Sequence, residues 1–396
     1  MAHFIPGNLT ELRETVAEAL AAGEPLELIG GGSKRGLGRP LQTPRALDLS
    51  RLSGIRAYEP NELVLTAAAA TPLAEIEQAL NENRQMLAFE PPDWRSLMGS
   101  GASTPTLSGV LACNLSGPRR IAAGAARDHF LGFRGVNGRG EIFKAGGRVV
   151  KNVTGYDLPK LMAGSYGTLA ALEEVTVKVL PRPETMCTIL VRTPDPAACL
   201  AAALKAPHEI SAAACLPPGI AAAGIGGVVA LRLEGPAPSV AARREAVLHD
   251  LDAGADTLAD AESREFWAAV GEAAPFAAHE RMVWRVSVAP DRGIALAETL
   301  SRRLDMRWFL DWGGGLLWAA VAGAEDGGAA VLRAAIRGED GRGTGHATLV
   351  RAPAALRRAV PVFEPQPPAL AALSRRVKQS FDPCGIFNPG RMVEGV

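Results

Sequence analysis

STPTLSGVLACNLSGPRR (103–120) and KNVTGYDLPKLMAGSYGTLAALEEVTVKVLP (151–181) are the two stretches that decide the fold. Both are rich in Gly, Ser and Thr, and short apolar runs typical of strands separate these residues. Glycine permits positive φ and close approach of the backbone to another group. Successive backbone N–H groups can also bind an anion. The pattern therefore indicates a backbone that is held close to a large polar ligand.

A third glycine-rich segment is PLELIGGGSKRGLGR (25–39), in which an apolar strand, Leu26 to Ile29, leads directly into a loop. The chain contains neither GxxxxGK[ST] nor GxGxxG, so the sequence supports neither a P-loop nucleotide site nor a classical dinucleotide-binding fingerprint. The glycine N–H groups, the hydroxyl of Ser33 and the charge of Lys34 or Arg35 could still cradle a pyrophosphate. For this loop taken alone, a flexible hairpin turn is the alternative.

Length and composition restrict the class of protein. A chain of 396 residues with 47% hydrophobic and 21% charged residues predicts a soluble enzyme or enzyme subunit of at least two domains. A formal net charge of +0 gives no basic footprint for nucleic acid. The first 20 residues show no basic region followed by an apolar run, so we expect no signal peptide. The uncharged run 210–231 contains two prolines, so we expect a loop and a strand there and no membrane span. Five cysteines without CxxC argue against an iron–sulfur site and indicate a reducing cytoplasm.

Local signals predict the main elements. Leu9 to Ala22 is predicted as a helix capped by Asn8 or Thr10 and ended by Gly23. A second helix is predicted over 71–81, with Thr71 as the cap and Pro72 at its first position. Strands are expected at 46–49 and 63–70. From Thr185 onward, helices at 195–205, 240–252 and 260–270 alternate with strands at 188–192, 227–233 and 282–288, which indicates a second domain built of helices on a sheet. Asp260 is the expected cap of the third of these helices.

The order of these segments resembles the FAD-binding domain of the vanillyl-alcohol oxidase / p-cresol methylhydroxylase (PCMH) type. The resemblance rests on GGGSKRG (30–36), VLTAAAATPLAEIEQAL (64–80), PTLSGVLACNLSGPRR (105–120), the 151–181 stretch and the closing FDPCGIFNPGRM (381–392). It implies an α+β fold with a PCMH-type FAD-binding domain of two subdomains over residues 1–182. An α/β cap domain with an antiparallel sheet would follow over 183–365, and a C-terminal segment, 366–396, would return to the FAD domain.

The resemblance also implies the residues that hold an extended FAD. Ile29, Gly30, Gly31, Gly32, Ser33 and Lys34 would bind the pyrophosphate, and Pro105, Thr106, Leu107, Ser108 and Gly109 would line the middle of the cofactor. Ser116 and Gly117 would lie near the ribityl chain or ring. The adenosine side would be covered by Gly164, Ser165, Gly167 and Thr168, followed by Glu174 and Val175. Asn388 would lie near the ring end. Tyr166 stands where the family more often has Glu. Loop 30–38 and stretch 100–112 contain no His or Cys, so we expect non-covalent FAD.

Relatives that oxidise hydroxy acids commonly carry HxGDGNxH in the cap, where the histidines bind a metal. The corresponding stretch here is DWGGGLLW (311–318), in which Asp311 and Trp318 occupy the metal-binding positions. An indole cannot ligate a metal, so no metal site is predicted. Catalytic residues are not identified. His129, His279 and His346 are candidates to face the flavin, each with a structural role as the alternative.

Within the family, the chain looks most like the GlcE-type subunits of bacterial glycolate oxidase. This implies an FAD-dependent oxidoreductase subunit of a cytoplasmic complex, peripheral to the inner membrane through its partners, that converts glycolate, a small 2-hydroxy acid, to glyoxylate. A sister FAD subunit would carry the metal motif, and an iron–sulfur subunit would receive the electrons. Two alternatives stay open. One is a structural subunit, and the other is a stand-alone flavoenzyme for another 2-hydroxy acid or alcohol, with His279 or His346 as base.

Overall fold

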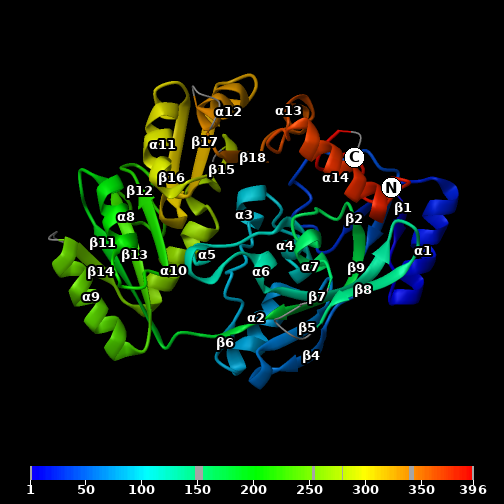
Figure 1. Ribbon diagram of the computed structural model, residues 1–396, viewed down its shortest axis with the longest axis horizontal. Helices are drawn as coiled ribbons and strands as arrows, with labels where there is room; N and C mark the ends of the chain where they lie inside the picture. Colours follow the sequence, from blue (N-terminus) through cyan, green and yellow to red (C-terminus); the bar gives the residue numbers. More distant parts are fainter. Residues whose placement is uncertain (1, 148–154, 252–254, 279, 339–342, 395–396) are drawn as a thin grey trace. The chain divides into compact units, whose positions relative to one another are not determined.

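The chain divides into two compact units in the computed structural model, which describes residues 2–147, 155–251, 255–278, 280–338 and 343–394 (Figure 1). The first unit comprises Met1–Leu115, Ala125–Arg182 and Pro365–Val396, and the second comprises Ser116–Gly124 and Pro183–Glu364. Each unit is therefore assembled from separate stretches of sequence. None of the described helices is both long and apolar enough to cross a membrane.

Three sheets form the framework of the first unit in its described part. The parallel sheet has the order β1-β3-β2, the antiparallel sheet has the order β4-β5-β9-β7-β8, and β6 pairs with β10. The strands are β1 (Ala2–Phe4), β2 (Leu26–Ile29), β3 (Arg45–Asp48), β4 (Ile55–Glu59), β5 (Val64–Ala68), β6 (Gln85–Met86), β7 (Phe130–Asn137), β8 (Ile142–Gly146), β9 (Ala170–Lys178) and β10 (Leu180–Pro181). The helices are α1 (Leu9–Ala22), α2 (Leu73–Glu82), α3 (Arg95–Met98), α4 (Leu107–Cys113), α6 (Ala126–His129), α7 (Leu158–Met162) and α14 (Pro368–Phe381).

Helix α1 confirms the predicted bounds and shows why they hold. The Asn8 side chain accepts a hydrogen bond from the Glu11 N–H at 2.9 Å and so caps the first turn. Gly23 ends the helix in the left-handed region, at φ 66°. Leu12 and Val16 are fully buried in a core that also contains residues of β2 and β3. This packing fixes α1 against the parallel sheet.

The prediction that Thr71 caps α2 is wrong. The helix begins at Leu73, and Pro72 occupies the cap position without a side-chain hydrogen bond. The Thr71 hydroxyl instead donates to the Ala68 carbonyl at 2.7 Å and accepts from the Gly54 N–H at 3.0 Å. Thr71 therefore bonds to the end of β5 and to Gly54, which lies 17 positions earlier, and these bonds occupy the hydroxyl that was expected to cap α2.

The C-terminal segment completes the first unit along the free edge of β2. Leu26 and Phe387 form a parallel bridge, in which the Leu26 N–H donates to the Ile386 carbonyl at 2.8 Å and the Asn388 N–H donates to the Leu26 carbonyl at 3.0 Å. The glycine-rich loop that leaves β2 therefore starts between β3 on one side and the C-terminal segment on the other.

The described part of the second unit contains one antiparallel sheet of order β14-β11-β13-β12-β16-β17-β15-β18. The strands are β11 (Thr185–Val191), β12 (Ala212–Leu216), β13 (Val228–Gly235), β14 (Ala255–Leu258), β15 (Met282–Val288), β16 (Asp305–Asp311), β17 (Leu316–Ala322) and β18 (Gly345–Arg351). The helices are α5 (Arg120–Ala123), α8 (Pro196–Lys205), α9 (Ala237–Leu251), α10 (Asp260–Gly271), α11 (Gly293–Ser301), α12 (Ala329–Arg337) and α13 (Ala354–Ala359). The run 210–231 thus holds β12 and the start of β13, where we expected one strand.

Alternation along β11 shows how the helices cover this sheet. Ile189 and Val191 point into a core that also contains apolar residues of α8, α9, α11 and α12. Thr188 points to the other face, where its hydroxyl accepts a hydrogen bond from Trp267 of α10 at 2.8 Å. The prediction that Asp260 caps α10 is wrong. Asp260 lies in the first turn of the helix, and Ala259 occupies the N-cap position.

Candidate functional site

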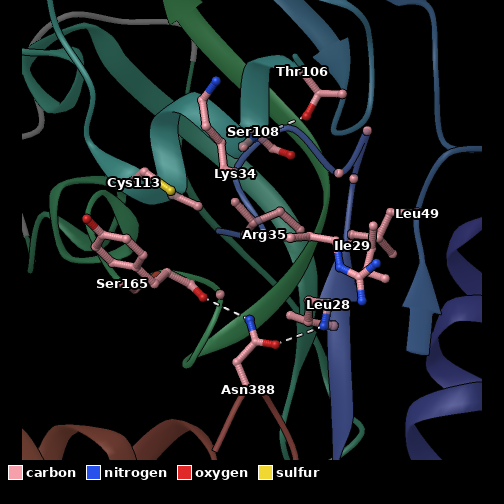
Figure 2. Close-up of a pocket in the computed structure, with 18 of the residues that line it drawn as sticks. Leu28, Ile29, Lys34, Arg35, Leu49, Thr106, Ser108, Cys113, Ser165 and Asn388 are labelled. Carbon is pink, nitrogen blue, oxygen red and sulfur yellow. Dashed lines mark hydrogen bonds between the residues drawn. The ribbon is translucent and has the colours of Figure 1, made fainter. Parts of the chain in front are cut away.

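A pocket in the first unit brings together most of the residues expected to hold a cofactor (Figure 2). Its walls come from the end of β2 and the following loop, from α4, from the region around loop 165–167 and from the C-terminal segment. The lining residues are Leu28, Ile29, Gly30, Gly31, Gly32, Ser33, Lys34, Arg35, Leu49, Thr106, Ser108, Gly109, Ala112, Cys113, Met162, Ser165, Tyr166, Gly167, Ala170, Leu172, Asn388 and Arg391.

The glycine loop lies directly against the strand-like segment that leads into α4. The Thr104 N–H donates to the Gly31 carbonyl at 2.8 Å. A Cβ on Gly31 would lie only 1.8 Å from the Thr104 carbonyl oxygen, and Gly32 has a φ of 81°. Only glycine satisfies both requirements, because it has no Cβ and tolerates positive φ. The loop can therefore present backbone groups to a ligand at close range.

Helix α4 forms a second wall of the pocket. The Thr106 side chain caps it by accepting a hydrogen bond from the Gly109 N–H at 3.3 Å. This cap fixes the turn that carries Ser108 and Gly109 to the pocket surface. Cys113, at the last position of α4, also lines the pocket, and desolvation raises the pKa of its thiol to about 11 although Lys34 and Arg391 act in the opposite direction.

All charged side chains among the described lining residues are basic: Lys34, Arg35 and Arg391. Arg35 forms two hydrogen bonds to Glu27, which lies behind the pocket wall. Arg391 donates from Nη1 to the Arg35 carbonyl at 3.0 Å. Burial lowers the pKa of Arg391, and the nearby Glu27 carboxylate partly offsets this effect. This lining fits the charge of a pyrophosphate, whose oxygens accept charge-assisted hydrogen bonds.

Asn388 joins two walls of the pocket (Figure 2). Its Oδ1 accepts a hydrogen bond from the Leu28 N–H at 2.9 Å, and its Nδ2 donates to the Tyr166 carbonyl at 2.8 Å. Tyr166 itself has a φ of 54°, so the turn it occupies is held in an unusual conformation. The neighbouring Thr168 hydroxyl donates to the Ser165 carbonyl at 2.7 Å. The C-terminal motif thus sets the position of both β2 and loop 165–168.

The structure brings some predicted residues to the pocket and places others elsewhere. Those at the pocket are Ile29, Gly30, Gly31, Gly32, Ser33, Lys34, Thr106, Ser108, Gly109, Ser165, Gly167 and Asn388. Those of the first unit outside its lining are Pro105, Leu107, Gly164, Thr168, Glu174 and Val175; Ser116 and Gly117 belong to the second unit. Sequence reasoning missed Arg391 and Cys113. Arg391 follows Asn388 by three positions in FNPGRM, which was the available signal.

The cap stretch 311–318 makes structural contacts in the second unit. Asp311 is buried and accepts a hydrogen bond from the Trp312 N–H at 2.6 Å, and Trp318 stacks on Phe309 with the ring centroids 6.2 Å apart. The guanidinium groups of Arg120 and Arg285 lie 4.5 and 4.7 Å from the Trp312 ring centroid. Within the described residues, no group of three or more His, Cys, Asp and Glu side chains could hold a metal ion.

The three histidine candidates differ in their surroundings. His129 is buried in the first unit, with its ring centroid 5.4 Å from that of Phe89. His346 has an exposed side chain on β18 of the second unit, where partial desolvation and then the charge of Arg285 lower its pKa. His279 lies outside the described residues, as do residues 148–154, which include the start of the KNVTGYD motif.

Comparison with known proteins agrees with this geometry. The FAD binding domain family matches residues 2–146. The glycolate oxidase subunit GlcE of Escherichia coli is 35% identical over 384 residues, which is 96% of each chain. The glycolate oxidase subunit GlcD of Bacillus subtilis is 40% identical over 102 residues, 26% of this chain and 21% of that protein.

Solved structures share the fold at low sequence identity. A 4-ethylphenol oxidase from Gulosibacter chungangensis has a TM-score of 0.70 and 16% identity, covering 99% of this chain and 89% of its own. A p-cresol methylhydroxylase structure has a TM-score of 0.70 and 14% identity, covering 99% and 88%.

The chain belongs to the PCMH-type FAD-binding flavoproteins, and it is an FAD-dependent oxidoreductase with the α+β fold of that class. More narrowly, it belongs to the GlcE family, which it matches over nearly its whole length.

Proposed function

We propose that this chain is the FAD-binding subunit of a glycolate oxidase complex that converts glycolate to glyoxylate, and that the pocket of the first unit is its FAD site. One observation carries the site: a glycine loop that needs close backbone approach and a wholly basic set of charged lining residues meet in one pocket. Similarity to GlcE over 96% of the chain supports the complex and its substrate.

Each wall has a role in this proposal. The backbone of Gly30 to Gly32, together with Arg35 and Arg391, would hold the pyrophosphate, and Ser165 and Gly167 would meet the adenosine side. Asn388 was expected near the ring end, but its side chain donates to the Tyr166 carbonyl between these two residues, so we propose that it lies on the adenosine side with them. When bound, FAD supplies the acceptor for the two electrons that glycolate loses. The protein binds and orients it.

We expect FAD to be held without a covalent bond. Cys113 is the cysteine among the lining residues, and its raised pKa keeps the thiol neutral. A neutral thiol is a poor nucleophile, because the thiolate is the reactive form. Loop 30–38 contains no histidine or cysteine.

The partners follow from what the chain lacks. Its five cysteines include no CxxC, so an iron–sulfur acceptor belongs on another subunit. The partial match to GlcD supports a sister flavin subunit of related sequence. We place the complex in the cytoplasm, peripheral to the inner membrane through these partners.

The first test is the visible spectrum of the chain, expressed alone and purified by gel filtration. We expect the two-band absorption of an oxidised flavin and release of FAD on denaturation. The complex with both partners should oxidise glycolate, and the isolated chain should not reach the rate of the complex. A folded chain that is colourless, and that is still colourless after incubation with FAD and removal of the free FAD, would refute the flavin site. Full glycolate oxidation by the isolated chain would refute the subunit assignment.

A structural role within the same complex is the second candidate. The packing of Asp311 and Trp318 favours it, since both side chains serve the fold at positions where relatives bind a metal. Flavin counting separates the two proposals. A complex with FAD only in the sister subunit would support the structural role, and FAD in both subunits would exclude it.

A further inference from the structure

A buried lysine that does not line the pocket donates hydrogen bonds to carbonyl groups of two segments that form pocket walls. Lys378, in the last turn of α14, is 6% exposed, and its Nζ donates to the Thr168 carbonyl at 2.7 Å, the Phe387 carbonyl at 3.0 Å and Asp382 Oδ2 at 2.6 Å. Asp382 is 1% exposed and also accepts from the Ile386 and Phe387 N–H groups at 2.9 and 2.8 Å. The ammonium group therefore has three acceptors, and both carboxylate oxygens of Asp382 accept hydrogen bonds.

The three acceptors of Lys378 connect to the pocket although Lys378 and Asp382 do not line it. The Thr168 carbonyl ends the turn that begins at Ser165 and includes Gly167. The Phe387 carbonyl directly precedes Asn388, whose side chain bonds to Leu28 and to the Tyr166 carbonyl. One ammonium group thus fixes loop 165–168 relative to segment 386–391.

The energetics argue for a geometric role. Burying an ammonium group costs several kcal/mol unless it is fully hydrogen-bonded and paired, and an apolar residue of similar size is often no less stable at such a place. Asp382 and two carbonyls compensate this lysine, but stability alone does not require it. A compact cation with three donors does specify where three separate oxygens lie.

We propose that Lys378 is a positioning residue for FAD and that it sets the spacing between loop 165–168 and segment 386–391 where both border the pocket. It acts through Thr168, Asp382 and Phe387, without touching the cofactor. This inference rests on the proposed assignment of the pocket to FAD.

The test compares Lys378→Met with Thr66→Val in full-length apoprotein. Thr66 and Thr176 share a buried hydroxyl pair at 2.9 Å in the sheet of the same unit, away from the pocket lining, so Thr66→Val controls for lost buried hydrogen bonding. We expect Lys378→Met to raise the Kd for FAD at least tenfold by flavin fluorescence and to alter the visible band shape. The Kd for FAD of Thr66→Val should stay within twofold of that of the unaltered chain. Its apoprotein Tm should fall by about as much as that of Lys378→Met. A Kd within twofold for Lys378→Met would overturn the inference.

A measurement on the unaltered chain decides the matter if Lys378→Met does not fold. Addition of FAD to apoprotein should slow hydrogen exchange at the amides of Ile386 and Phe387, which bond to Asp382. Unchanged exchange there, with FAD bound, would overturn the inference and leave the FAD site intact. Failure of the unaltered chain to bind FAD would refute the proposed site itself.

Discussion

Glu27 and Arg35 form two parallel hydrogen bonds, from Arg35 Nε to Oε1 at 2.9 Å and from Nη2 to Oε2 at 2.6 Å. Arg391 Nη2 lies 4.0 Å from the same carboxylate. One carboxylate therefore faces two guanidinium groups, and the cluster keeps a positive charge beside the pocket. Because Glu27 is buried and held by Arg35, it keeps the cluster together without placing a negative charge in the pocket lining.

Replacing Arg391 by Met should weaken FAD binding through its phosphates. We expect the Kd for FAD to rise about tenfold or more, which corresponds to about 1.4 kcal/mol. Riboflavin has no phosphate, so its affinity should change much less. Arg39→Met is the control, since the Arg39 side chain pairs with Glu394 and does not line the pocket. Equal losses for FAD and riboflavin would show that Arg391 supports only the fold.

Gly31→Ala should abolish tight FAD binding. Its new Cβ would meet the Thr104 carbonyl oxygen at 1.8 Å, so the loop must move away from segment 104–106. Gly101→Ala is the matched control, because a Cβ there has nothing within 4 Å. Equilibrium dialysis with FAD measures both variants. Retained affinity in Gly31→Ala would mean that the loop does not hold the cofactor.

Cys113 should resist alkylation at pH 8 in apoprotein. Its pKa is raised to about 11 by desolvation, so the thiolate is scarce until the pH approaches that value. Cys384 is exposed and should react first. Mass spectrometry of peptides after iodoacetamide treatment measures the alkylation rates of both cysteines. In a separate experiment, acid precipitation of the FAD-loaded chain should leave all FAD in the supernatant. Flavin that stays with the precipitated chain would contradict non-covalent binding.

Thr188→Val should destabilise the second unit by about 1–3 kcal/mol, because it removes the buried acceptor of Trp267 Nε1 and the partner of the Ser263 hydroxyl. Thr299→Val, at an exposed position of α11, should change stability little. Urea unfolding followed by tryptophan fluorescence measures both. The Kd for FAD should not change in either variant, and a loss in Thr188→Val would mean that the second unit contributes to binding.

Sequence reasoning succeeded where the signals were local. The cap at Asn8 and the stop at Gly23 defined α1, and the strand-like run 282–288 predicted the strand Met282–Val288 with its observed bounds. It failed where a distant group competed for a side chain. Thr71 bonds to Gly54, and Asp260 accepts from the Met186 N–H, 74 positions away, so neither residue caps its helix. No local pattern contains these partners.

The same distinction applies to the site. The sequence pointed to the glycine loop because Gly30, Gly31 and Gly32 are consecutive, and their lack of Cβ atoms is what the close approach to segment 104–106 requires. Arg391 and Lys378 were not predicted, since their roles depend on contacts with Arg35, 356 positions away, and Thr168, 210 positions away. Ser116 and Gly117 were expected at the cofactor by resemblance, whereas the structure joins Gly117 to Trp312 through a 3.0 Å hydrogen bond. Their role at the flavin stays a prediction.

The bond between Leu28 and Asn388 spans 360 positions of sequence. A ribosome that adds about 5–20 residues per second needs roughly 20–70 s to pass from one to the other. During that interval β2 and the glycine loop emerge without their C-terminal neighbour, and the exposed strand edge is open to wrong pairing. The pocket can close only after Asn388 has left the ribosome, so loading of the cofactor has to wait for this segment, and any nonsense mutation before Asn388 would prevent it.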